Sequence, residues 1–116
     1  MESCLFCKIA HGEIPSRKVY EDEDVFAFHD IKPARPVHIL VIPRRHITSL
    51  ATATEADTHV LGRILAVANQ LAIENGSPDG FRVIINTGRI GHQEVQHLHA
   101  HIVGGPDPVG PMLKRV

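Results

Sequence analysis

The stretch QHLHAHIVGG, residues 96–105, decides how this chain is read, because it carries a histidine at every second position. Successive side chains of a β-strand point to opposite faces of the sheet. A strand here therefore places His97, His99 and His101 on one face and the apolar residues between them on the other. The apolar face is typical of a protein core, whereas the other face carries imidazoles that titrate near neutral pH.

The composition is that of an ordinary globular protein. The chain has 116 residues, 43% of them hydrophobic and 22% charged, with a formal net charge of −1. It has no basic block, which disfavours nucleic acid as a partner, and no apolar stretch of the roughly 20 residues that span a membrane. The N-terminal residues do not resemble a secretion signal. We therefore expect a single cytoplasmic domain spanning residues 1–116.

The rest of the chain predicts an α+β fold, an antiparallel sheet of about five strands with one long helix. The long helix is expected at residues 52–75, where Thr52 and Glu55 fit a capping box and Gly76 provides a stop. A short N-terminal helix or loop is expected at residues 4–11. The predicted strands are residues 18–20, 25–28, 37–42, 81–86 and 95–103.

A glycine-bearing loop, NTGRIGHQEVQ, precedes the histidine strand. Gly88 and Gly91 allow backbone N–H groups to approach a ligand closely, and Asn86 and Gln93 add polar side chains. Such a loop beside histidines suggests an anion cradle, and phosphate is the obvious anion. Taken alone, the loop is better explained as a glycine-rich turn between two strands.

Together, the loop and the HLHAHIV string resemble the histidine triad (HIT) family of nucleotide hydrolases and transferases, in its nucleoside phosphoramidase-like branch. The segments FAFHDIKP (26–33), HILVIPRRHI (38–47), CLFCKI (4–9) and GEIP (12–15) extend the resemblance over nearly the whole chain. It implies a HIT-like fold and hydrolysis of nucleoside 5′-phosphoramidates or related AMP conjugates, through a covalent nucleotidyl-histidine.

The resemblance also implies roles for four histidines. His99 would attack the α-phosphorus, with its other ring nitrogen held by the backbone carbonyl of His97. His101 would donate to the phosphate oxygens as charge develops on them. His38 would contact the catalytic histidines without contacting the substrate. For any single histidine, the alternative is a hydrogen-bonded structural group.

An AMP-like purine nucleotide is the ligand that the resemblance implies. Asp30 would accept hydrogen bonds from the ribose, and Gln93 would donate to the phosphate. The nucleotide-binding residues carried over from the family are Phe6, Ile14, Phe28, Asp30, Ile31, Asn86, Gln93, Val95, His99 and His101. Ordinary core packing is the alternative for the apolar members of this set.

Cys4 and Cys7 have the spacing of a metal-binding thiolate pair. Some family members bind structural zinc through two such cysteines and two histidines, which here match His46 and His97. A tetrahedral Cys2His2 site would be closed and therefore structural, so no cofactor is expected for catalysis itself. The alternative is a pair of reduced thiols without metal.

Two residues of the glycine-bearing loop depart from the family pattern. His92 stands where relatives often have glycine, and it could crowd the loop or donate to phosphate. Glu94 stands where some relatives have serine. Because a carboxylate repels phosphate, we expect Glu94 to be solvated.

Two further functions compete with this hydrolase. The three alternating histidines could be the ligands of a metal-dependent hydrolase, or the chain could be a nucleotide-binding regulatory protein with vestigial hydrolysis. The resemblance also implies a homodimer, joined through the long helix and a strand of each chain.

Overall fold

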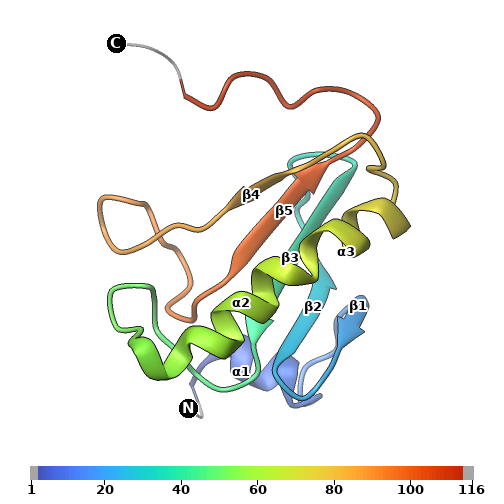
Figure 1. Cartoon of the computed structure of the whole chain (residues 1–116). Helices are drawn as coiled ribbons and strands as arrows, with labels where there is room; N and C mark the ends of the chain where they lie inside the picture. Colours follow the sequence, from blue (N-terminus) through green and yellow to red (C-terminus); the bar gives the residue numbers. More distant parts are fainter. Residues whose placement is uncertain (1–2, 114–116) are drawn as a thin grey trace.

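The computed structural model describes residues 3–113, whose strands form one five-stranded sheet. The strands are β1 (Lys18–Glu21), β2 (Val25–His29), β3 (Val37–Pro43), β4 (Arg82–Ile84) and β5 (Ala100–Gly104). Every neighbouring pair is antiparallel, and the order is β1-β2-β3-β5-β4 (Figure 1). The predicted α+β class with an antiparallel sheet is confirmed.

One long helical segment crosses the sheet. It consists of a short 3-10 turn η1 (Glu55–Asp57), α2 (Thr58–Ala66) and α3 (Ala68–Glu74). Val67, between α2 and α3, keeps right-handed helical angles and donates its N–H to the carbonyl of Arg63 at 3.1 Å. The predicted long helix is therefore present, and the short N-terminal helix is α1 (Leu5–Ala10). Among residues 3–113, no helix has both the length and the hydrophobicity to cross a membrane.

The long helix begins later than predicted, because a different threonine caps it. Thr54 accepts a hydrogen bond from the N–H of Ala56, and the Asp57 carboxylate accepts one from the N–H of Thr54 at 2.9 Å. Thr52, the expected cap, instead donates its hydroxyl to the carbonyl of Ser49 at 3.1 Å. The predicted stop is correct: Gly76 has a φ of +111°, a value that favours glycine.

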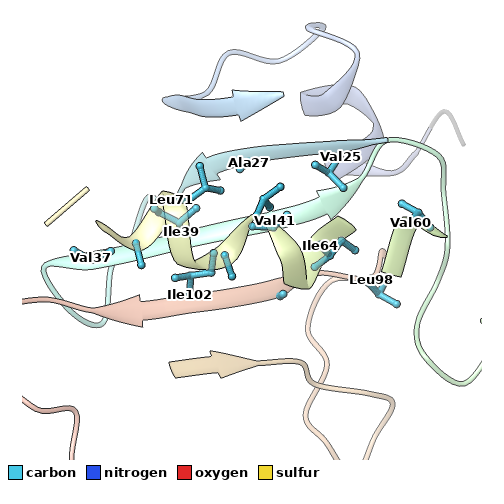
Figure 2. Packing of buried hydrophobic residues seen from close by; sticks show 14 of the residues in the cluster. Val25, Ala27, Val37, Ile39, Val41, Val60, Ile64, Leu71, Leu98 and Ile102 are labelled. Atoms are coloured by element: carbon cyan, nitrogen blue, oxygen red, sulfur yellow. The ribbon is translucent and has the colours of Figure 1, made fainter. Parts of the chain in front are cut away.

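The two faces of the sheet are covered by different helices. Alternate residues of β2 and β3 point to opposite faces, so that Ala27 and Val41 pack under α2 and α3, whereas Phe28 and Leu40 pack under α1. Figure 2 shows the larger cluster, in which Ile64 and Leu71 of the long helix lie over the strands. The alternation in the histidine stretch places Leu98, Ala100 and Ile102 in this larger cluster. The histidine face therefore belongs to the α1 side of the sheet.

Strand β5 is shorter than the predicted strand 95–103. Its ladder with β3 runs from Val37 opposite Gly104 to Val41 opposite Ala100. Continuing this register would place Leu98 opposite Pro43, which has no N–H to donate. The N–H of Leu98 instead donates to the carbonyl of Ile47 at 2.7 Å, beyond the end of β3.

Candidate active site and metal centre

A cavity of about 430 Å³ lies on the α1 side of the sheet. Its walls come from α1, the end of β2, β3, β5 and the loop before β5. Eight of the residues expected to bind a nucleotide line it: Phe6, Phe28, Asp30, Ile31, Asn86, Val95, His99 and His101. The sequence did not point to Leu5, Ile9, Lys32 and Leu40, which also line it, because an apolar or single charged residue carries no distinctive pattern.

Two residues expected at the nucleotide do not line this cavity. Ile14 is partly buried and packs against the smaller apolar cluster, which α1 forms with Phe26, Phe28, Leu40 and Ile42. The side-chain amide of Gln93 turns into the protein and donates to the carbonyls of Thr48 and Val95. The structure therefore separates these two residues from the other eight.

His99 has one ring nitrogen fixed by the backbone. Its Nδ1 lies 2.7 Å from the carbonyl oxygen of His97. Because a carbonyl can only accept, Nδ1 must carry a proton, so in the neutral ring the lone pair is on Nε2. The ring is 6% exposed and stands edge-on to Phe6, with centroids 5.2 Å apart. His99 is thus an imidazole of fixed orientation on the wall of the cavity.

His101 has the opposite tautomer, set through His38. The N–H of Ala34 donates to Nδ1 of His38 at 3.0 Å, so the proton of the neutral His38 ring is on Nε2. This Nε2 lies 2.9 Å from Nδ1 of His101 and 3.4 Å from the Asp30 carboxylate. His101 therefore accepts at Nδ1 and keeps a proton on Nε2. Nothing in the sequence pointed to Ala34, because every residue other than proline carries a backbone N–H.

Burial keeps His101 neutral at physiological pH. Desolvation, followed by the neighbouring His99 and His38, lowers the pKa of His101 to about 4. The carboxylates of Asp30 and Glu94 raise this pKa, but by less than the burial and the neighbouring histidines lower it. The cavity thus presents the neutral N–H donor of His101 beside the ring of His99.

The four expected metal ligands lie together at one end of this site. Cys4, Cys7, His46 and His97 each offer a ligand atom, and these atoms lie within 4.8 Å of one another. Nδ1 of His97 is 3.2 Å from the Cys4 sulfur and 3.5 Å from the Cys7 sulfur. Nδ1 of His46 is 3.4 Å from the Cys7 sulfur.

These four groups fit a tetrahedral zinc ion. Zinc bonds of about 2.3 Å to sulfur and about 2.0 Å to nitrogen imply sulfur–nitrogen separations of about 3.6 Å. Nε2 of His97 lies 2.9 Å from the carbonyl of Pro43 and must donate to it, which leaves the Nδ1 lone pair facing the sulfurs. Burial also raises the pKa of the Cys7 thiol, so a thiolate there requires a neighbouring cation.

The three alternating histidines do not converge on one point. Nδ1 of His97 faces the two sulfurs, Nδ1 of His99 faces a carbonyl, and Nδ1 of His101 faces His38. Within the part of the chain that the structure describes, His97, His99 and His101 do not form one cluster of ligand atoms. This arrangement disfavours a single metal ion held by all three.

The backbone of the loop before β5 is strained at His92, one of the two residues that depart from the family pattern. His92 has a φ of +59°, a left-handed value that costs a residue with a Cβ about 1 kcal/mol. Its Nε2 lies 3.1 Å from the Glu94 carboxylate, and both side chains are exposed at the mouth of the cavity. Glu94 is therefore solvated, as expected. Gly91 is required, because a Cβ there would lie 2.6 Å from backbone atoms of Thr87.

Comparisons with known proteins identify the family of this chain. A family model described as "Scavenger mRNA decapping enzyme C-term binding" matches residues 3–114. The purine nucleoside phosphoramidase of Escherichia coli K12 is 46% identical over 113 residues, covering 97% of this chain and 94% of the relative. A 14 kDa zinc-binding protein of Zea mays is 50% identical over 103 residues, covering 87% and 80%.

A solved structure extends the agreement to the fold. The HIT family hydrolase from Clostridium thermocellum superimposes with a TM-score of 0.91 at 43% sequence identity, covering 97% of this chain and 99% of that one. Sequence, fold and the alternating histidines thus agree, and the chain belongs to the histidine triad family.

Proposed function

We propose that this chain is a nucleotide hydrolase that cleaves nucleoside 5′-phosphoramidates or related AMP conjugates through a covalent intermediate on His99. The observation that carries this proposal is the 2.7 Å contact between Nδ1 of His99 and the carbonyl of His97. In the neutral ring this contact puts the lone pair on Nε2, on the wall of a cavity large enough for a nucleotide. The phosphoramidase activity named for the Escherichia coli relative supports the choice of substrate.

The reaction divides into two displacements. Nε2 of His99 forms a bond to the α-phosphorus, and the bond from phosphorus to the leaving nitrogen breaks, with the departing amine taking up a proton from the solvent. Water then attacks the same phosphorus and returns a proton to the solvent, which breaks the phosphorus–Nε2 bond and releases AMP. The carbonyl of His97 stabilises the positive charge that the ring acquires in the first step.

His101 is proposed to stabilise the phosphate oxygens. Its Nε2 proton, fixed through His38 and the N–H of Ala34, is a donor that needs no reorientation during the reaction. His38 acts only through His101 and is therefore a positioning residue.

The nucleoside is proposed to lie across the apolar end of the cavity. Phe6, Phe28 and Ile31 would enclose the base, and the Asp30 carboxylate would accept hydrogen bonds from the ribose hydroxyls. Asn86 and Val95 would contact the nucleotide from the loop side. An apolar slot reads a base by stacking and shape, so discrimination between purines should be weak.

We further propose that Cys4, Cys7, His46 and His97 hold a structural zinc ion. When bound, the ion would neutralise the thiolates and tie the N-terminal segment to the segment before β5. The name of the Zea mays relative supports this assignment. Reduced cysteines serving as ligands favour a cytoplasmic location.

A homodimer is also proposed, through the long helix and the edge strand β4. Leu65 on α2, Ile73 on α3 and Ile84 on β4 are exposed by 56%, 49% and 37%, which leaves apolar surface for a second copy. Leu65→Glu should shift the protein from dimer to monomer in analytical ultracentrifugation. A wild-type protein that sediments as a monomer would refute this proposal.

Intact-protein mass spectrometry after rapid acid quenching tests the proposed reaction. Mixing with an adenosine 5′-phosphoramidate should add one adenylyl mass to the peptide that contains His99, and His99→Asn should abolish both the adduct and turnover while retaining AMP binding. Binding of AMP without any adduct or turnover would instead favour the nucleotide-binding regulatory protein. Turnover that depends on an added metal and persists in His99→Asn would favour a metal-dependent hydrolase.

A further inference from the structure

Every hydrogen-bonding group of the Gln93 side chain is engaged within the chain. Its Oε1 accepts from the N–H of Gly88 at 3.0 Å, and its Nε2 donates to the carbonyls of Thr48 at 2.7 Å and Val95 at 2.9 Å. A side-chain amide has two N–H donors, so both are used. The residue is only 9% exposed. Gln93 therefore has no free donor for a phosphate.

These bonds join two parts of the molecule that are distant in sequence. Gly88 is held twice, because the backbone N–H of Gln93 also donates to its carbonyl at 3.0 Å. Val95 lines the cavity. Thr48 lies two residues after His46, and its hydroxyl is 3.3 Å from Nε2 of His46. Gln93 thus lies between the cavity loop, residues 86–95, and the segment that carries a metal-site histidine.

We infer that Gln93 is a positioning residue that fastens the cavity loop to the His46–Thr48 segment, and not a ligand of the phosphate. The inference deepens the proposed function and rests on it, because the cavity is taken as the nucleotide site. Losing Gln93 should disturb both ends of the connection. The cavity loop would lose its attachment beside Val95. The four candidate metal ligands Cys4, Cys7, His46 and His97, called the metal cluster below, would lose the restraint on His46.

Gln93→Met removes this connection with little change of side-chain length. It leaves the carbonyls of the half-buried Thr48 and Val95 without this donor, and the N–H of Gly88 without this acceptor. We expect Zn²⁺ to be released to a chelator at least about fivefold faster than from the wild type. Gln93→Glu keeps an acceptor for Gly88 but places a carboxylate against two carbonyls. It should also accelerate the release of zinc, and it replaces Gln93→Met if that variant does not fold.

Two controls separate this role from general destabilisation. Gln70→Met changes an exposed glutamine on α3 whose side chain donates to the carboxylate of Glu74 on the same helix. Ser77→Ala removes a buried hydroxyl that bonds Gly105, beyond the far end of β5, and it should lower stability without loosening the metal cluster. Neither control should accelerate the release of zinc under native conditions.

Nuclear magnetic resonance of the zinc-loaded, ¹⁵N-labelled full chain gives the decisive readout. On titration with AMP, the side-chain amide resonances of Gln93 should stay in place while backbone amides of the cavity loop shift. A Gln93 side-chain resonance that moves as far as those amides would overturn the inference, as would wild-type zinc release from both Gln93 variants. If AMP shifts no resonance, the proposed nucleotide site fails, and the zinc-release comparison alone decides the role of Gln93.

Discussion

The carbonyl oxygen of His97 accepts a hydrogen bond from Nδ1 of His99 at 2.7 Å, while the ring of His97 faces the two cysteine sulfurs. One residue therefore belongs to both the metal cluster and the candidate active site. Its backbone sets the tautomer of the candidate nucleophile, and its side chain fixes that backbone. Loss of the metal cluster should consequently also disturb the hydrogen bond that orients His99.

Cys7→Ser should lower both the zinc content and the stability of the protein. The loss of a structural metal ligand is among the most destabilising changes known, and we expect at least about 2 kcal/mol, or roughly 10 °C in melting temperature. Elemental analysis and thermal unfolding measure the two effects. Chelation of the wild type should reproduce the shift and should add nothing in Cys7→Ser; an unchanged melting temperature in both cases would contradict the zinc site.

His38→Phe should lower kcat by about 10- to 100-fold, a smaller loss than removal of a direct transition-state donor. The substitution removes the N–H that bonds Nδ1 of His101, so that the proton of His101 is free to occupy either nitrogen. Steady-state kinetics with an adenosine phosphoramidate checks this, with AMP affinity measured in parallel. Wild-type kcat in the variant would mean that His38 does not set the tautomer of His101.

Gly104→Ala should destabilise the fold by about 3 kcal/mol or more, as expected for overpacking a buried site. A Cβ on Gly104 would lie 2.1 Å from the hydroxyl oxygen of Ser77, which itself bonds the carbonyl of Gly80 and the N–H of Gly105. Urea unfolding measures the loss. Gly62→Ala on α2 is the matched control: among the described residues its Cβ would meet nothing within 4 Å beyond the backbone of its own helix, and it should gain up to about 1 kcal/mol from helix propensity.

His92→Gly should raise the free energy of unfolding, by up to about 1 kcal/mol, because it relieves the left-handed backbone. The side chain is 86% exposed, so little packing is lost with it. Urea denaturation again gives the measurement. A clear loss of stability would show that the contact of His92 with Glu94 outweighs the backbone cost.

The protein should lose stability as the pH falls from about 6.5 to about 4. The pKa of His101 is about 4 in the folded chain, against an ordinary value of 6.5, so in this window the unfolded chain binds a proton that the folded chain does not. His97, whose pKa burial also lowers to about 4, contributes with the same sign. Chemical denaturation at several pH values across this range measures the free energy of unfolding. Its dependence on pH should be shallower in His101→Asn than in the wild type.

The sequence alone was sufficient for the alternation of the histidine stretch, the antiparallel α+β architecture and the four members of the metal cluster. These features follow from side-chain period, from residue type and from family motifs, all of which are local. The capping threonine and the start of β5 were misplaced, because they depend on which backbone groups find partners elsewhere, as Leu98 does at Ile47.

Tertiary structure decided the protonation pattern of the site and the role of Gln93. The proton positions on His99 and His101 are set by the carbonyl of His97 and by the N–H of Ala34, acting through His38. The family resemblance had implied the contact of His99 with the carbonyl of His97. Nothing in the residue pattern pointed to the N–H of Ala34, because every residue other than proline carries a backbone N–H. Residue types determined which chemistry is available, and the folded backbone determined which nitrogen or amide is free to perform it.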